Sequence, residues 1–235
     1  MNIETVETVA RCDSPRGEVV LRRRIADGRS VEELIINGAF AMDSRETSTE
    51  RLLAELALPT GRGQRVLIGG LGLGYTVNAV SAQDVDAIDV VEIEPCLIEW
   101  AYQEVTATLA AAASEPRVRL HAMDIKRVLE GVVDEPVGLW DAIVLDVDNG
   151  PDFLIHDDNR ALYTSTSLSA AYSQLAAGGT LAIWCQHPAP QLRTVLEGIA
   201  PSVREHVIDT SRGGRIFPHT IYTISRLQHS TVGAR

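Results

Sequence analysis

Acidic residues cluster where one apolar segment of this chain ends, and their spacing could support proton transfer or ammonium binding. The segment Trp140–Pro151 begins as an apolar strand and then presents Asp146, Asp148 and Asn149. Carboxylates at such a position can hold an amine nucleophile and accept its proton while it attacks a carbon atom. The same acids could instead bind a hard cation, or form an Asx-type turn with Asn149. We take Asp146 and Asp148 as the candidate catalytic residues.

A glycine-rich loop after an earlier apolar strand predicts a nucleotide-binding site. Gly70, Gly72 and Gly74 follow the strand Val66–Gly69 and open a predicted helix. Glycine lets the backbone approach a ligand closely and adopt positive φ, and the helix behind it offers free N–H groups. The spacing is G-x-G-x-G, which differs from the G-x-G-x-x-G typical of nicotinamide dinucleotide sites. A purely structural tight turn is the alternative.

Two further predicted strands end in acids that could hold a nucleoside. Glu92 ends the next strand, roughly twenty residues after the loop, where a carboxylate can accept hydrogen bonds from both ribose hydroxyls. Asp124 ends the third strand and could accept from an adenine amino group, while apolar neighbours such as Ile125 sandwich the ring. The alternative for Glu92 is an exposed charge. Asp124 could also be a helix N-cap, a role compatible with ligand binding.

Short apolar runs alternate with helical stretches from Arg65 onward, as is typical of βαβ units and a parallel sheet. The predicted strands are Val66–Gly69, Ala87–Ile93, Val118–Met123, Ala142–Val147, Thr180–Cys185, Val203–Ile208 and Ile221–Ser225. The predicted helices are Thr76–Ala82, Cys96–Ala113, Lys126–Leu129, Ala161–Ala176 and Ala189–Ile199. The last two strands leave no room for a crossover helix, so an antiparallel edge strand is expected. The pattern predicts an α/β protein with a seven-stranded Rossmann-like methyltransferase fold.

The N-terminal part of the chain predicts a small appendage to this sheet. Alternation over Gly17–Arg23 and the β-rich run Leu34–Ile36 predict a β-hairpin cap. The segment Ser44–Leu58 carries early acids and an apolar stripe, which predicts a core-facing helix that includes Glu50. We therefore divide the chain into residues 1–60, the cap and helix, and residues 61–235, the nucleotide-binding catalytic domain.

The net charge and the cysteine content indicate which class of ligand the protein binds and in which cellular compartment it lies. The chain has 235 residues and a formal net charge of −11 at pH 7, so a nucleic acid would be repelled. A cationic small molecule would be attracted, although acidity also serves solubility alone. The three cysteines form no CxxC pair, which indicates neither a disulfide framework nor a zinc site and favours the reducing cytoplasm. We see no leader pattern and no membrane-length apolar run, and expect no membrane attachment.

Five segments, taken in order along the chain, resemble motifs of the spermidine synthase family and together span roughly residues 17–200. They are Ile35–Gly38 (their Leu-x-Leu-Asp-Gly), Gly70–Gly74 (Gly-Gly-Gly-Asp-Gly), Val91–Glu94 (Val-Glu-Ile-Asp), Asp146–Pro151 (Asp-Ser-Ser-Asp-Pro) and Trp184–Gln186 (a Gln-containing strand). The resemblance implies a decarboxylated S-adenosylmethionine donor, an Asp base at Asp146, and commonly a homodimer. It also implies acceptor-binding roles for Glu50, Asn149 and Gln186.

Departures from the family pattern leave the donor and the acceptor open. Leu73 stands where the family has an Asp that contacts the amino group of the donor, which favours ordinary S-adenosylmethionine slightly. Ser48 and Thr49 replace the Tyr and His of the polyamine channel, so putrescine is not the expected acceptor. We expect a spermidine-synthase-like transferase that uses S-adenosylmethionine or its decarboxylated form to add a methyl or aminopropyl group to a small-molecule nucleophile. The alternative is a non-catalytic nucleotide-binding homologue.

Overall fold

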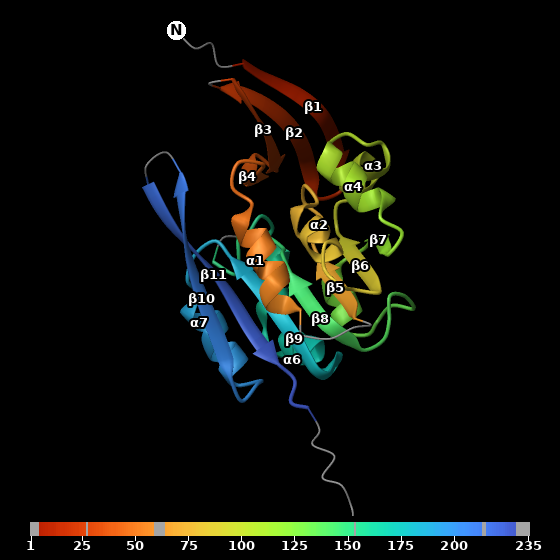
Figure 1. The fold of residues 1–235 in the computed structure, drawn as a ribbon, viewed down its shortest axis with the longest axis vertical. Helices are drawn as coiled ribbons and strands as arrows, with labels where there is room; N and C mark the ends of the chain where they lie inside the picture. Colours follow the sequence, from red (N-terminus) through yellow and green to blue (C-terminus); the bar gives the residue numbers. More distant parts are fainter. Residues whose placement is uncertain (1–4, 27, 59–63, 153, 213–214, 229–235) are drawn as a thin grey trace, which may run out of the picture.

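A computed structural model describes residues 5–26, 28–58, 64–152, 154–212 and 215–228, in which a four-stranded sheet lies above a larger, helix-flanked sheet (Figure 1). The strands are β1 (Thr5–Ser14), β2 (Gly17–Ala26), β3 (Arg29–Ile36), β4 (Ala39–Asp43), β5 (Arg65–Gly69), β6 (Ala87–Glu92), β7 (Val118–Ala122), β8 (Trp140–Leu145), β9 (Leu175–Cys185), β10 (Val203–Arg212) and β11 (Arg215–Ser225). The helices are α1 (Ser48–Ala57), α2 (Tyr75–Ser81), α3 (Pro95–Tyr102), α4 (Ala107–Ser114), α5 (Ile125–Leu129), the 3-10 helix η1 (Asp157–Tyr163), α6 (Ser165–Ser173) and α7 (Pro190–Glu197).

The larger sheet has seven strands in the order β10-β11-β9-β8-β5-β6-β7, which confirms the predicted α/β fold. The strands from β9 to β7 pair in parallel, and β11 runs antiparallel to both of its neighbours. The predicted antiparallel strand is therefore present, but it lies one position inside the edge. Strand β10, which follows helix α7, forms the edge of the sheet. Strand β11 then inserts between β10 and β9 and pairs with both.

The central strands are buried on both faces, and alternate residues of each strand point to opposite layers of helices. One face, including Val66 and Ile68 of β5, packs against helices α1 to α4. The other face, including Leu67 of β5 and Ile143 of β8, packs against α5, α6 and α7. In the part of the chain that the structure describes, no helix is both long and apolar enough to cross a membrane.

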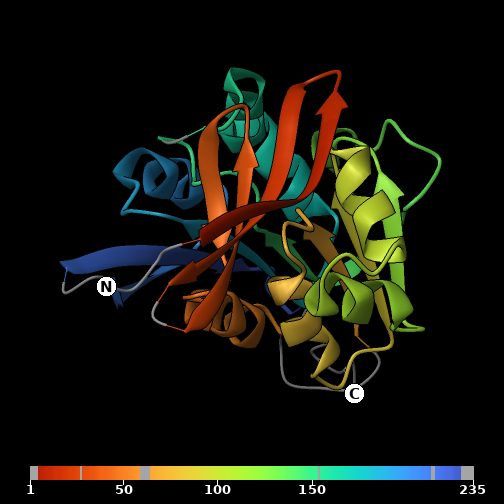
Figure 2. The ribbon, with the colours of Figure 1, turned by 90° about the horizontal axis from the view of Figure 1, so that it is seen from above.

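The predicted N-terminal β cap is present, and it is a four-stranded antiparallel sheet rather than a single hairpin (Figure 2). Strand β1 was missed because its residues are largely exposed and polar, and it is held mainly by ladder bonds to β2. The cap shares one hydrophobic cluster with the larger sheet, since Val19, Leu21 and Leu34 pack in the same cluster as Leu53 of α1. The predicted division at residues 60–61 lies outside the described residues and stays a prediction.

Two predicted helices are interrupted in the structure. The segment 96–113 forms α3 and α4, separated at Glu104, whose φ is 56°. Thr106 restarts the chain as an N-cap, because its hydroxyl accepts the Leu109 N–H at 3.2 Å. The segment 161–176 is also divided: Thr164 separates η1 from α6 and accepts the Ser167 N–H at 3.4 Å. Threonine N-caps inside each predicted helix thus start a second helix where the sequence pattern indicates one continuous helix.

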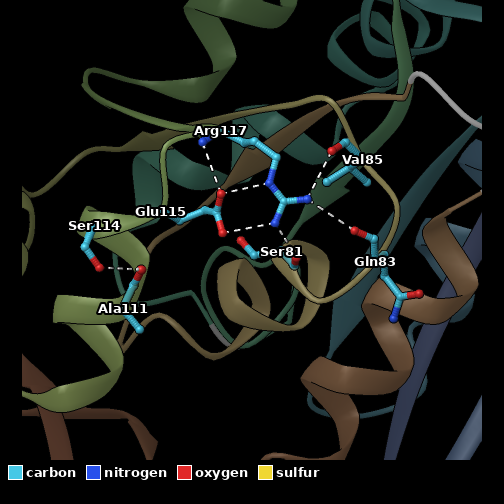
Figure 3. A network of polar contacts seen from close by, with 7 residues as sticks. All are labelled: Ser81, Gln83, Val85, Ala111, Ser114, Glu115 and Arg117. Carbon is cyan, nitrogen blue, oxygen red and sulfur yellow. Dashed lines mark hydrogen bonds and ion pairs between the residues drawn. The ribbon is translucent and has the colours of Figure 1, made fainter.

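Arg117 fixes the connections near the amino-terminal end of β7 (Figure 3). Its guanidinium pairs with Glu115 at 2.8 Å and donates to the Ser81 carbonyl at 2.7 Å. The same group donates to the carbonyls of Val85 at 3.1 Å and Gln83 at 3.4 Å. These contacts satisfy carbonyls that the end of α2 leaves unpaired, at the edge of the sheet opposite the strand ends that carry the candidate acids.

Because the cap and the larger sheet share one core, we predict that a cavity in the cap destabilises the whole chain. Leu21 is fully buried, so Leu21→Ala should lower the free energy of unfolding by about 2–5 kcal/mol. Urea denaturation followed by tryptophan fluorescence should show one cooperative transition at a lower midpoint. Val207→Ala, at a side chain that is 56% exposed, is the control and should change little. A separate early transition of the cap, with the main transition unmoved, would contradict this prediction.

Candidate functional site

A cavity lies at the carboxyl ends of β5, β6, β7 and β8, beneath β3 and β4 of the cap. Its wall combines carboxylates from the strand ends with apolar side chains of the cap. The acids are Glu50, Glu92, Glu94, Asp124, Asp146, Asp148 and Asp158, and the apolar cap residues are Leu34, Ile36, Ala41 and Met42. The cavity therefore sits where ligands of open α/β sheets bind.

The glycine loop brings two of its three predicted residues to the cavity. Gly70 has φ 97°, and a Cβ atom there would lie 2.2 Å from the Asp146 carbonyl oxygen, so only glycine fits. Gly72 has φ 52° and lies under the thioether of Met42. Gly74 has φ 86° and forms the N-cap of α2, where a Cβ atom would approach the Thr108 carbonyl at 3.1 Å. Gly70 and Gly72 line the cavity, whereas Gly74 shapes the loop from outside it.

Glu92 ends β6 and connects the glycine loop to the start of α3. One carboxylate oxygen accepts the Leu71 N–H at 2.8 Å, and the other accepts the Glu94 N–H at 2.8 Å. Burial raises the pKa of Glu92, and these backbone N–H groups partly offset that effect. Glu92 also lines the cavity. This geometry is compatible with the predicted ribose contacts.

Asp124 and Ile125 lie together at the end of β7. The Asp124 carboxylate accepts the Lys126 N–H at 2.9 Å, which confirms that this residue is the N-cap of α5. Both Asp124 and Ile125 also line the cavity, and Ile125 packs against Gly69. The capping role leaves a second carboxylate oxygen for a ligand, while the role in binding adenine stays a prediction.

The acids after β8 are placed differently from one another. Asp146 accepts the Thr76 hydroxyl at 2.5 Å, and burial raises the pKa of its carboxyl group. Asp148 has φ 55° and accepts the Ile155 N–H at 3.1 Å, with its pKa also raised by burial. Both line the cavity. Asn149 turns its amide toward the Phe40 carbonyl at 3.5 Å, outside the cavity wall.

Glu50 reaches the same cavity from helix α1. The Glu50 carboxyl group is buried and accepts the Thr49 hydroxyl at 2.7 Å. Burial, together with the charge of Asp146, raises the pKa of Glu50 to about 7. The structure thus brings the predicted acceptor residue Glu50 into the same cavity as the predicted catalytic residue Asp146. The third predicted acceptor residue, Gln186, donates its backbone N–H to the Asn149 carbonyl at 3.1 Å and does not line the cavity, so its role stays a prediction.

Several residues of the cavity were not predicted from the sequence. Arg16, from the β1–β2 turn, lies with its Nε 3.5 Å from Glu94 and donates to the Asn159 side chain at 3.1 Å. Trp184 also lines the cavity, and Thr76, which does not line it, donates its hydroxyl to the cavity residue Asp146. Arg16 and Thr76 belong to none of the motifs found in the sequence, and Trp184 belongs to the Trp184–Gln186 segment, in which only Gln186 was given a role. They lie at the site only because the cap, α2 and β9 fold against the strand ends.

The Asp-rich segment after β8 does not form a metal site in the described structure. Within residues 5–26, 28–58, 64–152, 154–212 and 215–228, no group of three or more His, Cys, Asp or Glu side chains is arranged to hold a metal ion. Asp146 and Asp148 instead hydrogen bond to Thr76 and to the backbone of Ile155. Among the described residues, both acids thus act as acceptors for donors of the protein itself.

Comparison with solved structures identifies the architecture. A spermidine synthase from Thermotoga maritima superposes with a TM-score of 0.74 at 16% identity, covering 93% of this chain and 72% of that chain. The chain has the spermidine synthase fold. A spermidine synthase bound to the transition-state analogue AdoDATO gives a TM-score of 0.73 with the same identity and coverage. No family model and no curated protein sequence matches the chain. The resemblance to spermidine synthases is thus confirmed at the level of the fold.

We predict that neutralising Glu50 stabilises the protein at alkaline pH. The folded-state pKa is about 7, above the ordinary value of 4.5, so wild-type stability falls as pH rises through this window. Glu50→Gln should therefore be more stable than wild type by about 1–3 kcal/mol at pH 8, with the difference vanishing below pH 4.5.

Urea denaturation at a series of pH values measures this difference. The exposed Glu55→Gln substitution on the same helix is the matched control and should show no such trend. A Glu50→Gln protein less stable than wild type at pH 8 would show that the ionised carboxylate is stabilised in the fold rather than strained.

Proposed function

We propose that this chain is an alkyl transferase that moves an aminopropyl or methyl group from a sulfonium nucleoside to a small-molecule amine. The donor would be decarboxylated S-adenosylmethionine or S-adenosylmethionine. One observation carries the proposal: acids from four elements, Glu92, Asp124, Asp146 and Glu50, meet in a single cavity. The solved spermidine synthase bound to AdoDATO supports a nucleoside-based donor for this fold.

The nucleoside half of the cavity is the end formed by β5, β6 and β7. Glu92 would accept hydrogen bonds from the ribose hydroxyls, and Asp124 would accept from the adenine amino group. Ile125 supplies an apolar surface for the base. Gly70 and Gly72 permit close approach of the backbone to the part of the nucleoside next to the sulfur.

The acceptor half lies between Glu50 and Asp146. When bound, the sulfonium donor supplies an electrophilic carbon and a neutral thioether leaving group. Asp146, oriented by the Thr76 hydroxyl, would hold the amine and take its proton as the new N–C bond forms. Glu50 would bind the same ammonium group in its ionised form. Catalysis would rest mainly on positioning in a site that excludes water.

The charge of the cavity supports a cationic ligand. Seven carboxyl groups line it, against the fixed cations Arg16 and Lys126. Arg16 already pairs with Glu94, and Lys126 pairs with Glu130 at 2.8 Å. Glu50, Glu92, Asp146 and Asp148 all have raised pKa values because of burial, so a bound cation would relieve an unfavourable charge.

We predict that the wild-type protein binds at least one of the two sulfonium nucleosides, seen as a rise in melting temperature. A ligand at 100 times its Kd adds about 2.7 kcal/mol of stability. Glu92→Gln should weaken this binding by about 10- to 100-fold, since charge-assisted hydrogen bonds to the ribose are lost. Glu99→Gln, at an exposed position of α3, is the matched control and should bind as wild type does. No melting shift with either nucleoside would remove the proposed donor.

We further predict that Asp146→Asn lowers turnover by about 10²- to 10⁴-fold without abolishing nucleoside binding. Mass spectrometry of the by-products, with a panel of small amines as acceptors, measures turnover and identifies the chemistry. 5′-Methylthioadenosine marks aminopropyl transfer, and S-adenosylhomocysteine marks methyl transfer. The exposed Asp134→Asn substitution is the control. Binding without any by-product in the wild type would favour the non-catalytic alternative, and an unchanged rate in Asp146→Asn would mean that another group takes the proton.

A further inference from the structure

Two cysteine thiols from distant parts of the chain meet where the cap touches the nucleotide-binding sheet. Cys12 lies on β1 of the cap, opposite Val19 of β2, and Cys96 lies in the first turn of α3. The Cys12 side chain is a close neighbour of the Cys96 thiol and interacts with it. Strand β1 contacts helix α3, as Figure 1 shows at the upper right of the molecule. The thiol pair therefore bridges two structural parts that no recorded disulfide joins.

The two thiols differ in their access to solvent. Cys96 is 3% exposed and belongs to the hydrophobic cluster shared by the cap and the sheet. Cys12 is only partly buried and packs on that cluster from outside. The remaining cysteine, Cys185, is buried in the cluster on the other face of the sheet. Cys12 and Cys96 are thus placed to react with each other, and Cys185 is not placed to compete.

The thiol pair lies near two residues of the cavity wall along the chain. Glu94 precedes Cys96 by two positions, and Arg16 follows Cys12 by four positions. Arg16 and Glu94 line the cavity and form an ion pair that joins the same two elements, the β1–β2 hairpin and the start of α3. A bond between the two sulfur atoms would therefore fix the cap against the rim of the site.

We propose that Cys12 and Cys96 are a modification site, an oxidisable thiol pair that forms a disulfide and locks the cap onto the nucleotide-binding sheet. The oxidant class is a peroxide. Disulfides of this kind in reducing compartments are transient and sensory rather than structural. The inference does not depend on the identity of the donor or the acceptor.

The reaction proceeds in two balanced steps with hydrogen peroxide. The Cys12 thiolate attacks a peroxide oxygen, the O–O bond breaks, and hydroxide leaves, giving a sulfenic acid. Cys96 then loses its proton and attacks the sulfenic sulfur; the S–S bond forms, the S–O bond breaks, and hydroxide leaves and is protonated to water. Two thiols are oxidised by two electrons in total, and one peroxide is reduced to two waters.

The order of the steps follows from the surroundings of Cys96. Burial first, and then its contact with Cys12 and the charges of Glu94 and Glu92, raise the pKa of the Cys96 thiol. A buried, protonated thiol reacts slowly with peroxide in solution. It meets the sulfenic acid of Cys12 without diffusion, because strand β1 packs against helix α3 and the two side chains are neighbours there. Cys12 is therefore the peroxide-reactive residue and Cys96 the resolving one.

The test uses the full chain treated with a small excess of hydrogen peroxide. We expect an intact mass lower by about 2 Da, which corresponds to the loss of two hydrogens. A peptide map without reductant should contain one joined peptide pair carrying Cys12 and Cys96, and dithiothreitol should reverse it. The melting temperature of the oxidised protein should rise by about 4 °C or more, because the bond closes a long loop.

Two variants separate this pair from other thiol chemistry. Cys185→Ser should still form the disulfide, whereas Cys12→Ser should keep a free Cys96 thiol after the same treatment. Cys12 is partly exposed, so Cys12→Ser should retain the wild-type melting temperature under reducing conditions. The proposal is overturned if peroxide leaves all three wild-type thiols free, converts Cys12 to a sulfinic acid, or yields a joined peptide that contains Cys185.

Discussion

The carboxylate of Glu92 is the connection on which the site depends. By accepting the N–H groups of Leu71 and Glu94, it ties the glycine loop after β5 to the junction between β6 and α3. A buried carboxylate is costly unless hydrogen bonds compensate for lost hydration. Glu92 meets this condition with backbone donors, and in doing so it fixes the loop that would hold a nucleoside and the turn that carries Glu94.

The cavity next to this carboxylate is lined by more carboxyl groups than basic side chains. Asp146 accepts a hydroxyl from Thr76 of helix α2, and Glu50 accepts the hydroxyl of Thr49, its neighbour in helix α1. Acids kept close together in a poorly hydrated space are typical of functional sites, where they are retained at a cost in stability. The architecture is that of the spermidine synthases, while the cap contributes an apolar wall and Arg16. The cap and the sheet therefore both contribute side chains to the cavity wall.

The sequence predicts the strand ends well because parallel strands bring successive carboxyl ends to one edge, so that Glu92, Asp124 and Asp146 had to meet. It predicts less where tertiary contacts decide. Strand β1 lacks an apolar face of its own and was missed, although it carries Cys12 and leads to Arg16. The amide of Asn149 turns away from the cavity toward Phe40, an orientation that no local pattern encodes.

The close approach of Gly70 to the main chain at Asp146 limits how this site can change over generations. A side chain at position 70 would occupy the space of a carbonyl oxygen, and main-chain atoms cannot be removed by substitution. A larger residue at position 70 would require the main chain at the end of β8 to move, and this segment also carries the Asp146 side chain. Descendants of this chain can therefore diversify readily through the cap, whereas the glycine and the peptide opposite it are inherited as one unit.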